Sequence, residues 1–509
     1  MDINKKVGQL IVAGFDGFVI NDHIRNLITR YNVGNVILFE KNCQSPEQVF
    51  KLVQELQELS MTHNGVPLFV TIDQENGIVN RIFDGVTNFP GNMAQTAGAT
   101  LEETEKIAEY TGNGLKALGI NFNLAPSLDV NNNPKNPVIG NRSFSDSADI
   151  VAERAIYAAR GYEKAGVIAT AKHFPGHGDT ELDSHLALPT VSHSRDRLDA
   201  AELLPFKTAI KSGIPAIMSA HIVFPALDDS GLPATLSKKI LTDLLRNELG
   251  FEGVLMTDCM EMKAIDNLYG TVKSTPIAIK AGADLICLSH TEATQIAAIE
   301  EVKTLLASDH ELQARIEEAC ARVVALKKRY GIVDLLANSY DDALKSLYQP
   351  EYEQLADRVS KASIVVTDGD NYLPITDKKV LVISPDGRAL TGADGLRQIP
   401  NFATYLATRS QNCTAVKIDN APTDEDVTKI VNQLDEFEII VIGTHNALFV
   451  TEQEQLVNKI IEKNKKIILI PLRNPHDHHL FPSVKTVIIP HEYTVRSMET
   501  VADILLKGE

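Results

Sequence analysis

Residues 172–185, KHFPGHGDTELDSH, gather side chains that can transfer protons or bind ligands into one short segment. Pro175, Gly176 and Gly178 are incompatible with a helix, so we expect this segment to be a bent loop. Three kinds of site are conceivable: a metal centre, a structural loop of polar side chains, or an acid–base pair. The polar residues concerned are Lys172, His173, His177, Asp179, Glu181, Asp183 and His185.

The spacing does not favour a metal centre. Zinc sites need three or four converging ligands, often placed four residues apart on a helix. Because the loop cannot be helical, the three-residue gap between His173 and His177 carries no geometric information, and His185 lies twelve residues beyond His173. We therefore expect no metal at this loop.

Part of the loop is expected to be structural. Asp179 and Glu181 are predicted to be bystanders in a hydrogen-bonded loop, and His177, between two glycines, is predicted to be a packed histidine that holds the loop's shape. Lys172 differs, because a lysine that ends a buried strand must find an anion or the hydroxyls of a ligand.

Asp183 and His185 form the candidate acid–base pair. Two residues apart in an extended segment, they project to the same side. A carboxylate there fixes the tautomer of the imidazole and raises its pKa toward neutrality, as a general acid/base requires. Asp258, in the strand-like stretch LMTDCMEM, is the candidate nucleophile. An ionised aspartate that faces a proton donor is the arrangement found in retaining glycosidases.

The elements that must position these residues alternate regularly from residue 7 to about residue 290. Short apolar runs rich in β-branched residues predict buried parallel strands, and amphipathic stretches between them, such as 45–60, 101–119 and 237–250, predict helices. Eight strands, each followed by a helix, favour a (β/α)8 barrel of the TIM type. The predicted strands are 7–15, 33–39, 67–73, 121–130, 166–174, 216–222, 253–258 and 283–289.

Chemically versatile residues recur at the carboxyl ends of these predicted strands. In such barrels that rim carries the active site, because the following loops converge there. An acid after a strand can instead cap the next helix, but several such positions together favour a functional site. The residues are Asp73, Asp129, Lys172, His173, His221 and Asp258.

A second unit, in which strands and helices are spaced differently, follows the barrel. Residues 311–331 predict a long amphipathic helix, and the polar stretch 336–360 is interpreted as a linker. Five apolar runs between 361 and 490, separated by helical patterns near 424–435, 451–463 and 495–507, predict a largely parallel sheet with flanking helices. The predicted division is therefore a barrel at 1–335, a linker at 336–360 and a smaller α/β sandwich domain at 361–509.

Bulk properties exclude some partners. A net charge of −18 argues against a nucleic-acid-binding protein, which needs a basic surface. No apolar run of about 18 residues exists, so we expect no membrane span. Five widely spaced cysteines, and an N-terminus without the features of a signal peptide, favour a reduced, cytoplasmic protein.

The motifs of the barrel resemble glycoside hydrolase family 3, in its β-N-acetylglucosaminidase branch. The resemblance rests on KHFPGHG with DSH at 172–185, IDQENGIVNR at 72–81, FPGNMA at 89–94, NLAPSLDVNNNPKNPVIGNRSF at 123–144, MSAHI at 218–222, PATLS at 233–237 and VLMTDCMEM at 254–262. LRNPHD at 472–477 resembles a second-domain segment of the two-domain members.

This resemblance implies an enzyme that hydrolyses terminal β-linked N-acetylglucosamine through a covalent glycosyl-aspartate, with no cofactor. It makes Asp258 the nucleophile, His185 the proton donor and Asp183 its partner. Further candidates for the pocket wall are Asp129, His221 and Met260. The residues it assigns to sugar binding are Asp73, Arg81, Arg142, Lys172 and His173.

Two positions depart from the family pattern. Asn76 stands where glycine is usual; asparagine tolerates a positive φ, so the turn can survive. His476 replaces a common aromatic residue, which puts a second-domain contact with the substrate in doubt.

Other activities stay open. A β-glucosidase of the same family would take its acid/base from a second-domain glutamate such as Glu452 or Glu454, although glutamates at a helix start are mostly first-turn charges. A β-N-acetylglucosaminide phosphorylase would share the fold and the Asp183–His185 pair. A metal-dependent barrel hydrolase and an inactive sugar-binding protein are further alternatives.

The natural substrate and the assembly also stay open. Muropeptide fragments, chitin oligomers and glycoprotein glycans all carry the predicted sugar, and the resemblance favours cell-wall recycling. The sequence does not indicate an oligomeric state.

Overall fold

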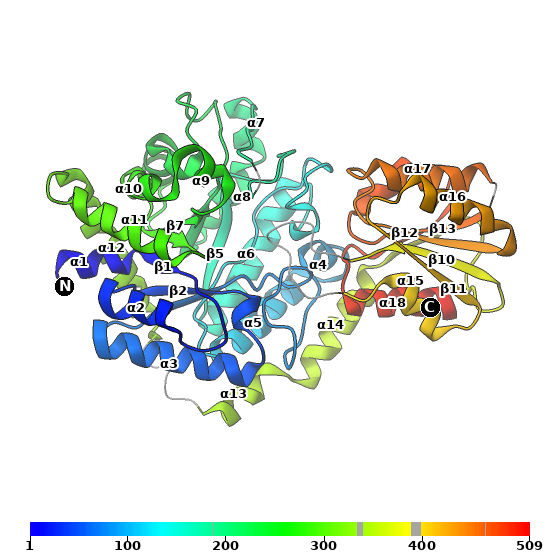
Figure 1. The fold of residues 1–509 in the computed structure, drawn as a ribbon, viewed down its shortest axis with the longest axis horizontal. Coiled ribbons are helices and arrows are strands. Elements are labelled where there is room, and N and C mark those ends of the chain that lie inside the picture. The colour runs from blue at the N-terminus through cyan, green and yellow to red at the C-terminus, as the bar shows by residue number, and fades with distance from the viewer. Residues whose placement is uncertain (186, 333–338, 388–398, 464, 509) are drawn as a thin grey trace.

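The computed structural model describes residues 1–185, 187–332, 339–387, 399–463 and 465–508. These residues form two sheets: a closed barrel of eight parallel strands and a separate six-stranded sheet. Figure 1 shows the two units side by side along the long axis, with the barrel carrying the blue to green part of the chain and the second sheet the yellow to red part.

The barrel confirms the predicted fold class. Its strands neighbour one another in chain order and β1 closes on β8. They are β1 (Ile11–Ala13), β2 (Asn35–Leu38), β3 (Phe69–Ile72), β4 (Phe122–Asn123), β5 (Ile168–Phe174), β6 (Ala216–Ser219), β7 (Val254–Cys259) and β8 (Leu285–Leu288).

Helices surround the barrel and connect successive strands. They are α1 (Ile3–Gln9), α2 (Asp22–Tyr31), α3 (Pro46–Asn64), α4 (Asn92–Gly98), α5 (Leu101–Ala117), α6 (Ala148–Ala165), α7 (Arg195–Ala200), α8 (Leu203–Lys211), the π-helix η4 (Lys239–Glu248), α9 (Lys263–Tyr269), α10 (Thr271–Ala281), α11 (Glu292–Leu305) and α12 (His310–Arg329). Short 3-10 turns are η1 (Glu40–Asn42), η2 (Gly140–Arg142) and η3 (Ala234–Leu236). No helix among the described residues is both long and apolar enough to cross a membrane.

Local sequence explains where the helices begin and end. The hydroxyl of Ser45 accepts a hydrogen bond from the backbone at Gln48, Pro46 opens α3, and Gly65 ends it in the left-handed conformation. In α5, Thr100 and Glu103 form a capping box.

One predicted strand is partly a helix. Residues 7–15 were expected to be extended, but α1 covers the first part of that run, because the side chain of Asp2 caps a helix at the backbone of Lys5. Only Ile11–Ala13 is extended. A short apolar run does not distinguish a buried helix turn from a strand.

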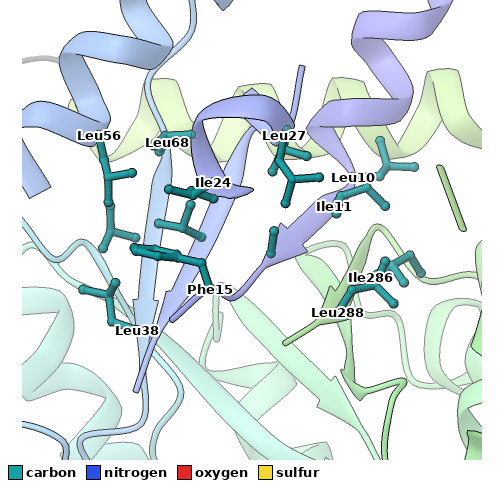
Figure 2. Close-up of a cluster of buried hydrophobic side chains, with 14 of the residues drawn as sticks. Leu10, Ile11, Phe15, Ile24, Leu27, Leu38, Leu56, Leu68, Ile286 and Leu288 are labelled. Carbon is teal, nitrogen blue, oxygen red and sulfur yellow. The ribbon is translucent and has the colours of Figure 1, made fainter. Parts of the chain in front are cut away.

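Two apolar layers hold the barrel together. Figure 2 shows the outer layer, where Leu10, Phe15, Ile24 and Leu56 fill the space between the strands and the surrounding helices. The inner layer fills the barrel itself with residues such as Phe69, and α12 contributes Val323 and Leu326 to it. The barrel is therefore a packed core, which leaves its carboxyl-terminal rim to carry the chemistry.

The second sheet has the order β11-β10-β12-β13-β14-β9, and all its pairs are parallel except β14 with β9. Its strands are β9 (Val365–Asp368), β10 (Val380–Pro385), β11 (Cys413–Ile418), β12 (Ile439–Thr444), β13 (Lys466–Pro471) and β14 (Thr486–Ile489). Its helices are α15 (Phe402–Arg409), α16 (Asp424–Gln433), η6 (Leu434–Glu436), α17 (Thr451–Glu462), η7 (Pro475–Leu480) and α18 (Val495–Lys507). The predicted α/β sandwich is confirmed as a class, and β11 and α15 are elements that the sequence did not predict.

The segment interpreted as a linker contains two helices, α13 (Tyr340–Leu347) and α14 (Pro350–Ser363). In α14, Tyr352, Ala356 and Val359 pack against Phe89 and Ile107 of the barrel. Residues 333–338 lie outside the described residues, and the boundaries at 335 and 360 stay predictions. Figure 1 shows α14 running from the barrel side toward the second sheet.

Candidate active site

A pocket opens at the carboxyl ends of the barrel strands and brings most of the predicted site residues together. Asp73, Arg81, Arg142, Lys172, His173, His185 and Asp258 all line it. Asp183 contacts the pocket through His185, to which it is hydrogen-bonded. These side chains come from the ends of β3, β5 and β7 and from the loops that follow β3, β4 and β5.

Asp258, in β7, is held as an anion. Its Oδ1 accepts a hydrogen bond of 2.7 Å from the backbone N–H of Cys259. Burial alone would raise the pKa of this carboxyl, but the imidazoles of His221, His173 and His185 lower it to about 2. An ionised carboxylate in an enclosed pocket is a competent nucleophile.

His185 is paired with Asp183 as the spacing predicted. Its Nδ1 lies 2.7 Å from Asp183 Oδ1, which also accepts from the backbone N–H of His185 at 2.8 Å. Burial works against the charged imidazolium, yet the carboxylates of Asp183 and Asp258 raise the pKa of His185 above its ordinary value. Because Nδ1 is engaged, Nε2 is the nitrogen that remains to exchange a proton with a substrate.

A network of charged groups forms another part of the pocket wall. Lys172 is almost fully buried, and its Nζ lies 2.7 Å from Asp73 Oδ1 and 2.6 Å from Glu75 Oε1. Arg142 binds the same Glu75 in a bidentate manner, at 3.0 and 2.8 Å. Burial opposes the ionisation of Glu75, but Arg142 and Lys172 hold its pKa well below the ordinary value. The buried Lys172 is thus paired with carboxylates, as its position predicts. The sequence points to Asp73 as a site residue but does not point to Glu75.

Asp129 proves to be an anchor rather than part of the pocket wall. It is completely buried and accepts hydrogen bonds from the Nδ1–H and backbone N–H of His173, at 2.7 and 3.1 Å. It also accepts from the backbone N–H of His177 at 2.7 Å. One carboxylate therefore orients the His173 ring and fixes the start of the loop that carries His185.

His177 is a packed histidine, as expected. Its two ring nitrogens lie 3.0 Å from Thr180 Oγ1 and 2.8 Å from Ser184 Oγ, within its own loop. Burial lowers the pKa of His177 to about 4, so the ring is neutral at physiological pH. The side chain thus ties Thr180 and Ser184 together, and Ser184 lies between Asp183 and His185.

Two other expected wall residues lie behind the pocket. Met260 is buried in the outer apolar layer, and Met262 lines the pocket in its place. His221 is buried between Thr235 Oγ1 and the carbonyl of Cys259, each 2.9 Å away. It supports the backbone next to Asp258 instead of facing a ligand.

The expected bystanders lie away from the pocket wall. Asp179 pairs with His193 at 2.5 Å, and Glu181 is exposed. Among the described residues, a group of potential metal ligands consists of Asp179, His193 and Glu202, and none of them lines the pocket. The guanidinium of Arg197 already contacts Glu202 at 2.8 Å. The histidines that prompted the metal interpretation are instead bound to Asp129, Thr180, Ser184 and Asp183.

Part of the pocket lining comes from residues that the sequence did not indicate. Phe39, Glu40 and Lys41 from the loop after β2, and His290 from the loop after β8, line the pocket together with the predicted residues. The rings of Phe39 and His290 lie 5.5 Å apart. These residues lie at or just after the ends of two predicted strands, 33–39 and 283–289. That position could have indicated them, because the carboxyl-terminal rim of such a barrel carries the active site.

Comparison with known proteins identifies the family of the chain. Residues 2–326 match the model of the glycosyl hydrolase family 3 N-terminal domain, which is more than half of the chain. The chain belongs to glycosyl hydrolase family 3. A β-hexosaminidase A from Pseudoalteromonas piscicida is 38% identical over 389 residues, which cover 71% of this chain and 64% of that protein. The match therefore spans less than two thirds of that relative.

Solved structures extend the similarity over both units. A family 3 β-N-acetylglucosaminidase from Paenibacillus sp. str. FPU-7 is 40% identical with a TM-score of 0.92, covering 99% of this chain and 97% of the other. A β-glucoside phosphorylase is 19% identical with a TM-score of 0.82, covering 100% and 93% of the two chains, and shows a shared fold alone.

The two departures from the family 3 pattern can now be placed. Asn76 adopts φ +73°, so the turn after β3 keeps the conformation that glycine usually supplies. His476 lies in η7, with its ring 5.7 Å from that of His479. Glu452 and Glu454 occupy the first turn of α17, as expected of helix-start charges. None of these three second-domain residues is among those that line the pocket.

Proposed function

We propose that the protein is a retaining exo-β-N-acetylglucosaminidase. His185 protonates the glycosidic oxygen through Nε2 while the carboxylate of Asp258 attacks the anomeric carbon, so the glycosidic bond breaks as the glycosyl–aspartate bond forms. His185, now neutral, then removes a proton from water. The water attacks the anomeric carbon, Asp258 leaves as a carboxylate, and the sugar is released with its configuration retained.

The observation that carries this proposal is the placement of three groups in one pocket. Asp258 and His185 line the same cavity, and Asp183 is paired with His185. The pKa of Asp258 is lowered, as a nucleophilic carboxylate needs, and the pKa of His185 is raised, as a proton donor needs. Asp183 holds the Nδ1–H and stabilises the imidazolium that delivers the proton.

The charged wall supplies sugar recognition in this proposal. Asp73 accepts hydrogen bonds from sugar hydroxyls, while Lys172, Arg81 and Arg142 donate to hydroxyl or acetamido oxygens. His173, fixed by Asp129, presents its other nitrogen to the pocket. N-acetylglucosamine is the sugar named for the Paenibacillus relative, which supports it as the substrate unit here.

Two finer parts of the proposal concern context. Cell-wall fragments that end in β-linked N-acetylglucosamine are the proposed natural substrates, and the cytoplasm is the proposed location. The proposed division of the chain is a catalytic barrel at 1–335, a connecting segment at 336–360 and a second domain at 361–509.

A panel of nitrophenyl glycosides, assayed with and without phosphate, tests the activity and the sugar together. The proposal predicts turnover of the β-N-acetylglucosaminide well above that of the β-glucoside, with free N-acetylglucosamine as product. Preference for the glucoside, or activity that disappears when a chelator is added, contradicts it.

Phosphorolysis is the second candidate function. It is supported by the use of a histidine, His185, as the acid/base. When His185 acts as the base it is neutral, so it repels an incoming phosphate less than a carboxylate would. If phosphate is the true acceptor, N-acetylglucosamine 1-phosphate accumulates instead of the free sugar in the same assay.

A further inference from the structure

Glu492 of the second domain lies directly against the barrel. It follows β14, and its side chain is 3% exposed. Its Oε2 accepts a hydrogen bond of 2.7 Å from the backbone N–H of Gly91, the residue that precedes α4, while Oε1 accepts from Thr494 Oγ1 at 3.1 Å. Among the described residues no cation forms an ion pair with it, and burial raises the pKa of Glu492 to about 7.

The backbone that Glu492 contacts is unusually close-packed. A Cβ added to Gly77 would lie 2.6 Å from the Cα of Gly91 and 3.1 Å from Glu492 Oε2. The N–H of Gly77 donates to the carbonyl of Phe89 at 3.0 Å. The turn after β3, the segment before α4 and the second-domain carboxyl therefore meet without intervening side chains.

From this contact a short chain of bonds leads to the sugar pocket. Asn92 follows Gly91 in the chain, and its side-chain amide donates a hydrogen bond of 2.7 Å to the backbone carbonyl of Arg142. The guanidinium of Arg142 binds Glu75. Glu75 in turn binds Lys172. A cavity behind this ion pair is lined by Glu75, Asn92, Asn141, Arg142 and Glu492, and the Asn141 amide has no hydrogen-bond partner among the described residues.

We propose that Glu492 is a positioning residue, through which the second domain sets the geometry of the charged wall that binds the sugar. It touches no substrate. Its hydrogen bond to Gly91 fixes the start of α4, where Asn92 lies. The side chain of Asn92 in turn fixes η2 through the carbonyl of Arg142. Arg142 and Glu75 are thereby held in position relative to Lys172. The inference rests on the proposed function, because it assigns that wall to sugar binding.

Steady-state kinetics of four variants test this route in the full-length protein. Glu492→Ala and Asn92→Ala should each raise both KM and the inhibition constant of free N-acetylglucosamine about tenfold, the usual effect of one lost hydrogen bond, with kcat little changed. Glu492→Gln keeps an acceptor for Gly91 and should resemble the wild type. Arg496→Ala, which removes ion pairs to Glu353 and Asp357 in α14 at the same junction, is the matched control and should also resemble the wild type.

The double variant of Glu492 and Asn92 provides the sharpest comparison. If both residues act along one route, the double variant should be no worse than either single variant. Glu492→Asp, whose shorter side chain withdraws from Gly91, replaces Glu492→Ala if the latter does not fold, and the same rise in KM is expected.

Four results overturn the inference: unchanged constants in Glu492→Ala, equal damage in Arg496→Ala, equal damage in Glu492→Gln, or additive effects in the double variant. A fall in kcat with unchanged KM overturns it as well, because that pattern places the damage at Asp258 or His185. These outcomes differ from failure of the proposed function, in which the wild-type protein itself turns over no N-acetylglucosaminide.

Discussion

Asp258 and His185 are assigned opposite roles because their surroundings differ. Burial disfavours the charged form of both groups. Three imidazoles near Asp258 outweigh burial and lower its pKa to about 2, while the carboxylates of Asp183 and Asp258 raise the pKa of His185. At neutral pH the pocket therefore presents a carboxylate ready to attack and an imidazole that can carry a proton.

Replacing Asp183 by Asn should move the alkaline limb of the pH profile of kcat/KM to lower pH. Asp183 raises the pKa of His185, so its loss lowers that pKa and the proton donor disappears at a lower pH. The acid limb, which follows ionisation of Asp258 in this account, should stay near pH 2 or be hidden by acid unfolding. An alkaline limb that does not move shows that His185 is not the proton donor.

Replacing His185 by Ala should slow hydrolysis by about 10²- to 10⁴-fold for a disaccharide, whose leaving group needs a proton. The loss should be smaller for a dinitrophenyl glycoside, whose leaving group departs as an anion. Glu181→Gln, an exposed acid in the same loop, is the control and should keep wild-type rates with both substrates. Equal losses for both substrates in the His185 variant argue against general-acid catalysis.

At the scale of elements, the loop after β5 is held by fixed contacts on the barrel. The backbone of Gly178 packs so closely on Val130 that a Cβ would overlap the Val130 carbonyl oxygen. The amide of Asn136 donates to the carbonyls of His177 and Gly178, at 2.7 and 2.9 Å. The loop base is thus rigid, and Asp183 and His185 are presented from a defined position.

Gly178→Ala should therefore reduce activity while the barrel stays folded. Overpacking at such a site costs about 1–3 kcal/mol, which displaces the loop more readily than it unfolds the barrel. Circular dichroism and kcat/KM measure the two effects separately. Gly114→Ala in α5, where the nearest atoms to a new Cβ are 3.9 Å away, is the matched control and should leave both unchanged. Full activity in Gly178→Ala contradicts a rigid loop base.

Much of the barrel could be predicted because the sequence features that indicate its strands and helices lie within short segments of the chain. Strand-like runs recur with helices between them, and Asp73, Lys172 and Asp258 fall at or next to strand ends, so their convergence follows from barrel geometry. The Asp183–His185 bond was predictable for the same reason, since both residues lie in one short segment.

What could not be predicted depends on contacts between distant residues or on weak local signals. Glu75 acquires its role from Arg142, which lies 67 residues away in sequence. Strand β11 is an edge strand with an exposed middle, so it lacks the apolar run that marked the others. The run at 7–15 predicts a strand where helix α1 begins, because the capping residue of that helix, Asp2, precedes only a short apolar run.

At the scale of the whole molecule, α14 is a structural part of the junction between the barrel and the second sheet. The end of α4 at Gly98 lies so close to α14 that a Cβ there would overlap the carbonyl oxygen of Val359. Arg358 of α14 also pairs with Glu103 of α5 at 2.5 Å. A polar segment that looks like a linker can thus be an ordered connector, which composition alone does not reveal.

Gly98→Ala should loosen the attachment of the second domain to the barrel. The new methyl group must push α14 away, at a cost of about 1–3 kcal/mol. Scanning calorimetry should show an earlier or broader unfolding transition. Gly114→Ala, which replaces a glycine inside a helix by a better helix former, should neither lower nor broaden the transition. An unaltered thermogram for Gly98→Ala shows that α14 does not couple the two units.

The covalent intermediate on Asp258 is the central claim, and trapping it is its most direct test. A mechanism-based fluorinated N-acetylglucosamine analogue should inactivate the enzyme with one sugar bound per chain. Peptide mass spectrometry of the digested, inactivated protein should place that sugar on Asp258, and the Asp258→Ala variant should remain unlabelled. A label on any other residue, or no covalent label on an enzyme that still turns over the substrate, would contradict the account.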